Sequence, residues 1–221
     1  MTSQELRPYQ EDAIDAAYAE LNCLNPILVS IATGGGKTLV ANHVAQRMQL
    51  TNGRKTLYVS KSWELLKQAA TSLRRNFPHA EKLMGRIGGD GSCLSFLPRA
   101  TTKHSALYTT LHSFKRQHHQ VDQPLGLIVY DESHFAEKRL LGQVLFTYAR
   151  DHRIPVLGVT ATPNADGSNF RNVYSRSFNE LVDDGYLARP IFITHKTQTD
   201  FHPELSTAGD FSPRSLNLLA R

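Results

Sequence analysis

The chain has 221 residues, a formal net charge of +5 and a hydrophobic fraction of 40%. This composition excludes a largely disordered chain, and the excess of positive charge favours a polyanionic partner. Its longest apolar runs are far shorter than the roughly 20 residues that span a bilayer, and its first residues are polar, so we expect neither a membrane helix nor a signal peptide. Two distant cysteines, Cys23 and Cys93, indicate neither a disulfide framework nor a zinc site.

Hydrophobic periodicity divides the chain into alternating strands and helices. Amphipathic spacing predicts helices over residues 8–21, 39–50, 63–77, 111–118, 137–150, 178–184 and, in the tail, 212–220. Short apolar runs predict strands over residues 27–32, 56–60, 83–87, 105–109, 125–130, 155–159 and 190–194. This alternation is typical of a central, mostly parallel sheet with helices on both faces. We therefore expect an α/β fold whose ligand site lies beyond the carboxyl ends of the strands.

The stretch Ile-Ala-Thr-Gly-Gly-Gly-Lys-Thr, residues 31–38, lies between the first expected strand and the second expected helix. A strand, a turn ending in Gly-Lys-Thr and a helix form the arrangement of a phosphate-binding loop. Glycines let backbone N–H groups surround an anion, and the helix N-terminus adds positive charge. Lys37 has the reach for the β- and γ-phosphates, and the Thr38 hydroxyl suits Mg²⁺. The predicted nucleotide-binding residues are therefore Thr33, Gly34, Gly35, Gly36, Lys37 and Thr38.

One position departs from the strict phosphate-loop pattern. Ile31 stands five residues before Gly36, where the pattern asks for Gly or Ala. A glycine-rich turn without a nucleotide is the alternative interpretation, but the strand and helix patterns on either side favour the phosphate loop.

Two carboxylates, Asp131 and Glu132, directly follow the apolar run 125–130. An aspartate at the end of such a strand can hold Mg²⁺ opposite Thr38, and the neighbouring glutamate can activate an attacking water as a general base. The alternative is a solvated pair without a chemical role. With the phosphate loop upstream, we interpret Lys37, Asp131 and Glu132 as catalytic, and Thr38 and Asp131 as the metal ligands.

Four segments resemble, in order, motifs Q, I, II and III of the superfamily 2 helicases. They are Leu-Arg-Pro-Tyr-Gln at 6–10, the loop at 32–38, Asp-Glu-Ser-His at 131–134 and Thr-Ala-Thr-Pro at 160–163. The first and third resemble the branch of RadD-like, UvsW-like and restriction-enzyme motor proteins. The resemblance implies an N-terminal RecA-like P-loop NTPase domain of an ATP-dependent DNA helicase or translocase. It also implies ATP and Mg²⁺ as cofactors, a nucleic-acid partner with DNA favoured over RNA, and a cytoplasmic protein encoded by a bacterium or phage.

The resemblance assigns roles to residues outside the phosphate loop. Gln10 would read the adenine edge, with Arg7 and Tyr9 nearby, because its amide carries both a donor and an acceptor. A polar residue that caps its own helix is the alternative for Gln10. His134, Thr160 and Thr162 would couple the nucleotide to domain movement.

The resemblance also implies contacts with the nucleic-acid backbone. The segment 60–66 resembles motif Ia, although Lys61 replaces the frequent histidine, and a lysine suits a phosphate. A double glycine and a pair of threonines resemble two further contact motifs, and an ordinary loop or helix cap is the alternative for each. We expect Trp63 to pack against its helix surroundings rather than against a base. The predicted contacts are Ser60, Lys61, Gly88, Gly89, Thr109 and Thr110.

This family uses two RecA-like domains and hydrolyses ATP between them. Residues 180–187 resemble the end of the first domain, so we expect domain 1 over 1–195 and a linker with the start of a missing second domain over 196–221. We expect residues 1–221 alone to bind ATP with little or no turnover. The alternative functions are an RNA helicase domain, a restriction-enzyme translocase motor and a non-motor nucleotide-binding regulatory module. The segments 6–10 and 160–163 argue against a small-molecule kinase.

Overall fold

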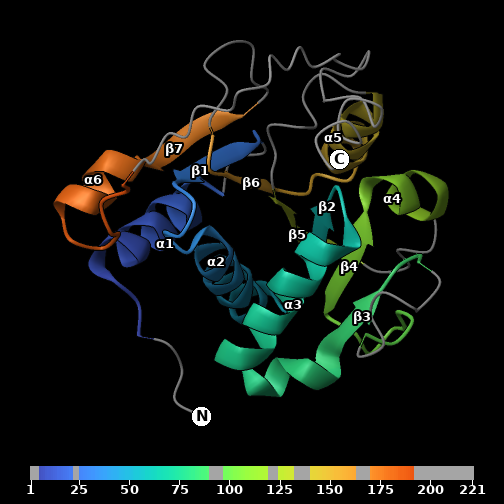
Figure 1. The fold of residues 1–221 in the computed structure, drawn as a ribbon. Helices are drawn as coiled ribbons and strands as arrows, with labels where there is room; N and C mark the ends of the chain where they lie inside the picture. Colours follow the sequence, from blue (N-terminus) through green and yellow to red (C-terminus); the bar gives the residue numbers. More distant parts are fainter. Residues whose placement is uncertain are drawn as a thin grey trace, which may run out of the picture. The chain divides into compact units, whose positions relative to one another are not determined.

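The computed structural model describes residues 5–21, 25–89, 97–118, 124–131, 140–162 and 170–191 (Figure 1). The chain divides into two compact units, residues 1–188 and 189–221. All helices and strands below belong to the first unit. Residues 189–191, the described part of the second unit, form neither helix nor strand. The expected domain boundary at residue 195 stays a prediction.

Helices and strands mostly alternate along the described residues, as predicted, except that β4 follows β3, β7 follows β6 and η1 follows α3 (Figure 1). The helices are α1 (Pro8–Glu20), α2 (Lys37–Asn52), α3 (Trp63–Asn76), the 3₁₀ helix η1 (Pro78–Leu83), α4 (Leu111–Gln117), α5 (Leu140–Asp151) and α6 (Phe178–Asp183). The strands are β1 (Ile27–Ile31), β2 (Lys55–Ser60), β3 (Met84–Arg86), β4 (Ala106–Thr110), β5 (Leu125–Asp131), β6 (Val156–Thr160) and β7 (Arg171–Arg176). None of these helices has the length and apolar character needed to cross a bilayer.

The strands form one seven-stranded sheet in the order β3-β4-β2-β5-β6-β1-β7. Every pair of neighbours is parallel, which confirms the expected α/β fold. Because all seven strands point the same way, their carboxyl ends share one edge of the sheet, which we call the carboxyl edge.

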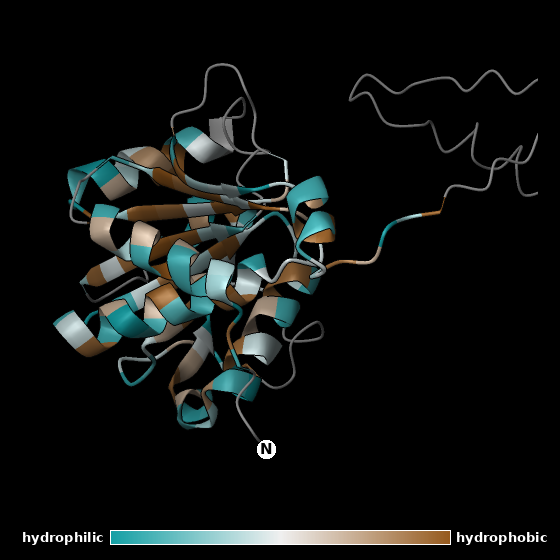
Figure 2. Ribbon diagram, turned by 90° about the vertical axis from the view of Figure 1, so that its left-hand side faces the viewer, coloured by the Kyte–Doolittle hydropathy of each residue, from teal (hydrophilic) through white to brown (hydrophobic). Residues whose placement is uncertain are grey.

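The strands alternate their side chains between two apolar cores. On β1, Ile27 and Val29 pack in the core with α1, α2 and α3, whereas Leu28 packs in the core with α4 and α5. On β2, Tyr58 joins the first core and Leu57 the second. Both faces of the sheet are therefore covered by helices, and the hydrophobic residues are concentrated in its strands (Figure 2). This explains why the strands read as continuous apolar runs rather than as alternating patterns.

Short polar residues set several helix ends. The Ser62 hydroxyl accepts a hydrogen bond from the Leu65 N–H at 3.5 Å at the start of α3, and the Thr110 hydroxyl accepts one from the Ser113 N–H at 3.2 Å at the start of α4. Each satisfies an N–H group that the first helical turn leaves unpaired. Gly53 ends α2 in the left-handed conformation, with φ 64°.

The fold differs from the sequence prediction in the 3₁₀ helix η1, which was not predicted, and in two strands. Strand β7 was not predicted, because Arg-Asn-Val-Tyr-Ser-Arg contains no apolar run. It lies at the end of the sheet and none of its residues is buried, since burial on both faces is not required there. The strand expected over 190–194 is wrong at Pro190 and Ile191, which form no strand. Its remaining residues, like 137–139 of the fifth helix and the helix over 212–220, lie outside the described residues.

The core contains a stacked tyrosine pair. Tyr58 on β2 and Tyr108 on β4 are register partners, and their ring centroids lie 4.8 Å apart. Both hydroxyls are buried and have no hydrogen-bond partner among the described residues. Burial raises the pKa of both phenols, because removal from water disfavours the phenolate. Each hydroxyl therefore carries an uncompensated desolvation cost.

We predict that Y58F stabilises the protein, because phenylalanine removes the unpaired hydroxyl and keeps the ring stack. The free energy of unfolding should rise by about 1 kcal/mol in urea denaturation. The control is Y18F, since the Tyr18 hydroxyl forms an exposed hydrogen bond with Thr51 and should matter little. A lower free energy of unfolding for Y58F would contradict the conclusion that the Tyr58 hydroxyl has no hydrogen-bond partner among the described residues.

The same pair predicts the direction of alkaline unfolding. Because the pKa of Tyr58 is raised in the folded state, the titration of this phenol takes nothing from the free energy of unfolding below the unfolded pKa of about 10. Above that pH the unfolded phenol ionises while the folded one stays protonated, so stability is lost as pH rises. Unfolding titrations of the wild type should show this loss, and Y58F should reduce it.

Candidate functional site

The phosphate loop joins β1 to α2 at the carboxyl edge. Gly34 and Gly36 adopt left-handed φ angles of 86° and 87°, which favour glycine. Helix α2 begins at Lys37, its first turn holds no acidic residue, and its N-cap residue Gly36 offers no capping side chain. The start of α2 therefore presents backbone N–H groups and the positive end of the helix dipole without a competing carboxylate. This arrangement is suited to a phosphate.

Two side chains of α1 fix the orientation of one loop peptide. The carbonyl oxygen of Gly35 accepts hydrogen bonds from the Tyr9 hydroxyl at 2.7 Å and from Gln10 Nε2 at 3.0 Å. The peptide bonds of the described residues are all trans, so a carbonyl and the following N–H point in opposite directions. The Gly36 N–H therefore points away from Tyr9 and Gln10. Tyr9 was expected near Gln10, but its contact with the loop was not predicted, because only the folded chain brings the two together.

Both polar atoms of the Gln10 amide form hydrogen bonds. Its Oε1 accepts a hydrogen bond from the Arg7 N–H at 3.0 Å, while its Nε2 contacts Gly35. The helix-capping alternative for Gln10 is therefore present in the structure, together with a contact to the phosphate loop. Recognition of adenine by Gln10 stays a prediction, and it requires the amide to exchange at least one of these partners.

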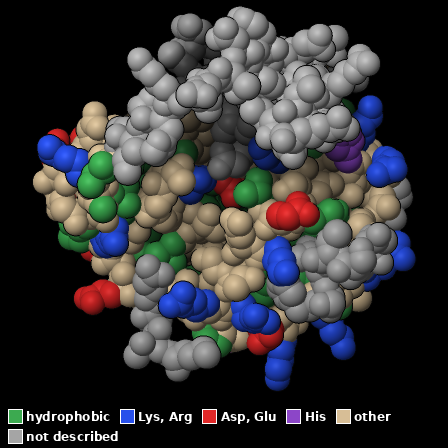
Figure 3. All heavy atoms as spheres, viewed as in Figure 1, with side chains coloured by type: hydrophobic (Ala, Val, Ile, Leu, Met, Phe, Trp, Pro, Cys, Tyr) green, Lys and Arg blue, Asp and Glu red, His purple; other side chains and the backbone are tan. Residues whose placement is uncertain are grey.

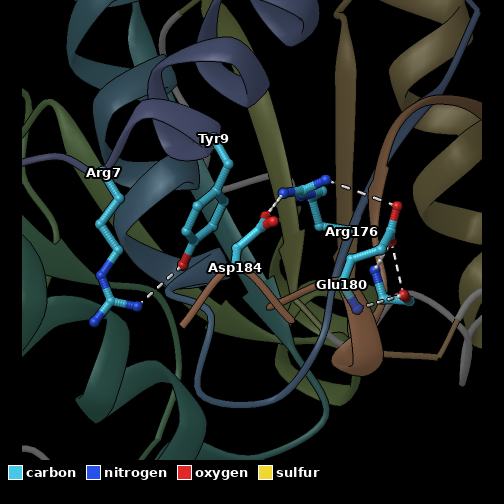
Figure 4. Close-up of polar contacts among 6 residues, drawn as sticks. Arg7, Tyr9, Arg176, Glu180 and Asp184 are labelled. Carbon is cyan, nitrogen blue, oxygen red and sulfur yellow. Dashed lines mark hydrogen bonds and ion pairs between the residues drawn. The ribbon is translucent and has the colours of Figure 1, made fainter. Parts of the chain in front are cut away.

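Arg7 and the end of the domain lie on the same side of the loop. Arg7 Nη1 donates to the Tyr9 hydroxyl at 3.4 Å and to the Tyr186 carbonyl oxygen at 3.2 Å, and Figure 4 shows Arg7 reaching toward Tyr9. In the same view, Arg176 at the end of β7 lies between two carboxylates, Asp184 and Glu180. Hydrogen bonding to Ser177, followed by the charge of Arg176, lowers the pKa of Glu180.

The other nucleotide motifs end the neighbouring strands. Register pairs Ser30 with Thr160 and Asp131 with Val159, so Asp131 on β5 lies two strands from the phosphate loop, or roughly 10 Å across the sheet. The Thr160 hydroxyl accepts from the Thr162 N–H and donates to the Thr162 carbonyl, both at 3.2 Å. Glu132 and His134 lie outside the described residues.

Thr38 and Asp131 offer a hydroxyl and a carboxylate oxygen, which are hard ligands of the kind that Mg²⁺ prefers. Within the described residues, no group of three or more His, Cys, Asp or Glu side chains could hold a metal ion. A hydroxyl and a carboxylate of this kind fit an ion that keeps several waters and takes further oxygens from phosphates.

The predicted nucleic-acid residues lie on the other half of the carboxyl edge, at the ends of β2, β4 and β3. Ser60 is the register partner of Thr110. Ser60 and Thr109 are buried, and the Thr109 hydroxyl donates to the Ile87 carbonyl at 3.0 Å. Thr110 caps α4, so the helix-cap alternative is realised there. The exposed members of the set are Lys61 and Gly89.

An arginine that the sequence did not reveal holds the double glycine. Arg86 Nη1 donates to the carbonyl oxygens of Gly88 and Gly89, both at 2.7 Å, and its Nε donates to that of Leu97 at 3.0 Å. Since the Gly88 carbonyl faces Arg86, the Gly89 N–H of the same trans peptide faces away from it. We call this arrangement the Arg86 clamp.

Both glycines of this loop are required by their backbone and by their neighbours. Their φ angles are 82° and 72°, a region that side chains disfavour. A Cβ on Gly88 would lie 2.5 Å from the Ser113 Cβ, and one on Gly89 would lie 2.9 Å from the Trp63 ring. Trp63 therefore packs against this loop and the first core, consistent with the packing role expected for it.

A cavity of 410 Å³ lies elsewhere, between α1, α2 and Phe77. It contains no residue of the predicted nucleotide or nucleic-acid contacts. His43 in its wall contacts the Phe77 ring, and burial lowers the pKa of this histidine. The cavity therefore does not belong to the site at the carboxyl edge.

Comparison with known proteins supports the motif assignment. The family described as "Type III restriction enzyme, res subunit" matches residues 3–165. The chain belongs to this family. The predicted superfamily 2 helicase resemblance and the N-terminal RecA-like domain are thereby confirmed. The match covers the phosphate loop, both carboxylates and the segment 160–163.

The family assignment agrees with individual relatives and solved structures. IRC3 of Saccharomyces cerevisiae, which is named as a candidate ATP-dependent helicase, is 29% identical over 97% of this chain. The chain spans about a third (32%) of that relative's length. The restriction-modification enzyme LlaGI matches 83% of this chain and 21% of its own, with a TM-score of 0.63 and 16% identity. The UvsW helicase of bacteriophage T4 matches 78% of this chain and 61% of its own, with a TM-score of 0.56 and 21% identity. These two structures support the fold.

We predict that Y9F weakens the binding of a nucleoside triphosphate by about 3- to 10-fold, because it removes one of the two donors that orient the Gly35 peptide, a loss of about 1 kcal/mol. Isothermal titration calorimetry of the full chain would measure the affinity. Y18F is the matched control, because Tyr18 lies on the same helix and its hydroxyl contacts Thr51 instead. Equal affinities for Y9F and the wild type would contradict the orienting role of Tyr9.

Proposed function

We propose that this chain is the N-terminal ATP-binding domain of an ATP-driven DNA helicase or translocase. It would bind ATP with Mg²⁺ at one half of the carboxyl edge and the backbone of a DNA strand at the other. Lys37 would contact the phosphates, Thr38 and Asp131 would hold Mg²⁺, and Glu132 would activate water. Arg7 and Gln10 would face the adenine, and His134, Thr160 and Thr162 would couple the nucleotide to movement.

The observation that carries this proposal is the order of the strands. The nucleotide motifs end β1, β6 and β5, which are adjacent, and the nucleic-acid motifs end β2, β4 and β3, which are also adjacent. Strands β5 and β2 are neighbours where the two halves meet. A movement of the nucleotide motif at the end of β5 would therefore occur next to β2, the strand that Lys61 follows. A motor requires such proximity, whereas a passive nucleotide-binding module does not.

Charge and relatives support a DNA partner. The net charge is +5, and Lys and Arg side chains are widespread on the face seen in Figure 3. Such charges contact phosphates and release counterions. The matched LlaGI structure is a complex with a DNA substrate mimic. Lys61, Gly88, Gly89 and the start of α4 would meet the DNA backbone, with the buried Ser60 and Thr109 shaping the strand ends behind them.

Hydrolysis would need the second RecA-like domain that the family resemblance implies. An arginine finger supplied across such a cleft is worth about 10³–10⁵ in rate in related nucleotide hydrolases. We propose that this domain is the chain's main protein partner and that residues 1–221 alone turn over little ATP. DNA-stimulated ATP hydrolysis by residues 1–221 would contradict this part of the proposal. The cytoplasmic location stays a prediction.

A restriction-type translocase motor is the second candidate. The description of the matching family favours it, and such a motor would move along duplex DNA without separating the strands. Binding of the chain to single-stranded DNA, duplex DNA and RNA of one sequence, each with and without ATP, would distinguish the candidates. Preference for duplex DNA supports the translocase, and binding to RNA alone would overturn the DNA assignment.

We predict that K37A lowers the affinity for MgATP by about 10- to 100-fold, because it removes a charge-assisted contact with the phosphates. E132Q should retain binding, since this glutamate is assigned to water activation. Calorimetry with the full chain would measure both. K67A is the matched control, because Lys67 is an exposed residue of α3 outside the predicted contacts. Unchanged binding by K37A would refute the nucleotide site.

We predict that R86Q weakens binding to single-stranded DNA by about 3- to 10-fold and leaves MgATP binding unchanged. Loss of the Arg86 clamp removes hydrogen bonds to two loop carbonyls, each worth about 1 kcal/mol or more. R150Q removes the same charge from an exposed site on α5. Comparing the two variants therefore distinguishes the loss of a positive charge from the loss of the hydrogen bonds that hold the loop. R86K should rescue only in part, because an ammonium lacks the planar fork. Equal losses in R86Q and R150Q would contradict the clamp.

A further inference from the structure

The segment 181–187, which comprises the end of α6 and the turn after it, lies against the phosphate loop. A Cβ added to Gly35 would meet Leu181 Cδ1 at 2.9 Å, and one added to Gly34 would meet Leu187 Cδ2 at 3.2 Å. Leu181 is fully buried in the first core. Two leucines of one short segment therefore support two successive glycines of the loop.

This segment is held in a closed turn. The Tyr186 and Leu187 N–H groups both donate to the Leu181 carbonyl oxygen, at 2.8 and 2.9 Å. Arg176 forms an ion pair with Asp184 (Figure 4), which joins the turn to the end of β7. The Arg176 carbonyl oxygen also accepts a hydrogen bond from the Ala32 N–H at 3.0 Å. The turn, the edge strand and the first residue of the loop are thus connected.

Tyr186 links this turn to the base side of the proposed nucleotide site. The Arg7 guanidinium lies 5.3 Å from the centre of the Tyr186 ring, and Arg7 Nη1 donates to the Tyr186 carbonyl at 3.2 Å. The Tyr9 ring lies 4.9 Å from the Tyr186 ring. A guanidinium is planar and stacks on aromatic rings, so an arginine held beside Tyr186 is placed to stack on a base.

We propose that Tyr186 is a positioning residue of the nucleotide site, which acts through Arg7, and that the segment 181–187 sets the phosphate loop and the base-side arginine together. The proposal rests on the proposed function, because it assumes that an adenine nucleotide occupies the loop. The preference for a triphosphate that carries a base would therefore depend on Tyr186, a residue at the end of the domain and far in sequence from motif Q.

The test compares two ligands in the full chain, MgATP and magnesium tripolyphosphate, by calorimetry. Tripolyphosphate needs the phosphate loop alone, whereas ATP also needs Arg7. Y186A should weaken MgATP by about 3- to 10-fold, the loss of a partly desolvated cation–π contact, and should leave tripolyphosphate unchanged. Y186F should bind both ligands as the wild type does, because it keeps the ring and the backbone carbonyl.

A double-mutant cycle tests whether Tyr186 acts through Arg7. Y186A should cost nothing further in the background of R7A, because the residue it orients is gone. Y18A is the matched control, since Tyr18 forms a similar contact with Arg47, at 4.1 Å, on the surface of α1 and α2. It should leave both affinities unchanged.

Several outcomes would overturn the inference. Equal losses for ATP and tripolyphosphate in Y186A would indicate a general structural role, and additive losses in the cycle would remove Arg7 as the intermediary. Unchanged ATP binding by Y186A would refute the positioning role while the proposed function stands. Failure of the wild type to bind MgATP would refute the proposed function itself.

Discussion

The carbonyl of Gly35 is the point on which the proposed nucleotide site depends. Tyr9 and Gln10 both donate to it, so one peptide of the phosphate loop is oriented by the first helix of the chain before any ligand binds. An amide held in advance costs little to reorganise when an anion arrives, which is the advantage of a preorganised site. The same two side chains connect the loop to Arg7 and, through it, to Tyr186. Residues from the beginning, the first loop and the end of the domain thus converge on one peptide.

The parallel sheet makes a second contribution, because it sorts the motifs by strand order rather than by sequence order. Along the chain, the three nucleic-acid motifs separate the phosphate loop from the nucleotide motifs at the ends of β5 and β6. In the sheet the motifs form two contiguous groups on the carboxyl edge, with β5 and β2 adjacent where the groups meet. A site that only binds a nucleotide needs no more than the phosphate loop and the strand-end carboxylate. When the nucleotide motifs and the nucleic-acid motifs share one edge of the sheet, a displacement at the first group can be transmitted to the second. This arrangement supports a motor rather than a storage or regulatory role.

Much of this was predictable, and the failures have physical causes. Buried strands such as Leu125–Asp131 are recognisable as apolar runs, and glycine with lysine marks the phosphate loop. No residue of strand β7 is buried, and the strand therefore carries no continuous hydrophobic signal. Arg86 and Tyr186 were missed because their roles consist of contacts with backbone carbonyls and rings, which leave no pattern in the sequence. For Gln10 and Thr110, the motif and the helix cap use the same polar atoms, so sequence could not separate the two roles.

The unusual residue of the phosphate loop also has a structural explanation. Ile31 is fully buried, and its Cγ2 lies 2.5 Å from where a Cβ on Gly35 would stand. The bulky side chain at the start of the motif therefore occupies the space that a side chain at Gly35 would need. Glycine at 35 is required by Ile31 and Leu181 together, even though its φ angle is not among the left-handed ones. The side chains of Ile31 and Leu181 therefore fill the core beside Gly35 and support its peptide, which leaves room only for a glycine at this position.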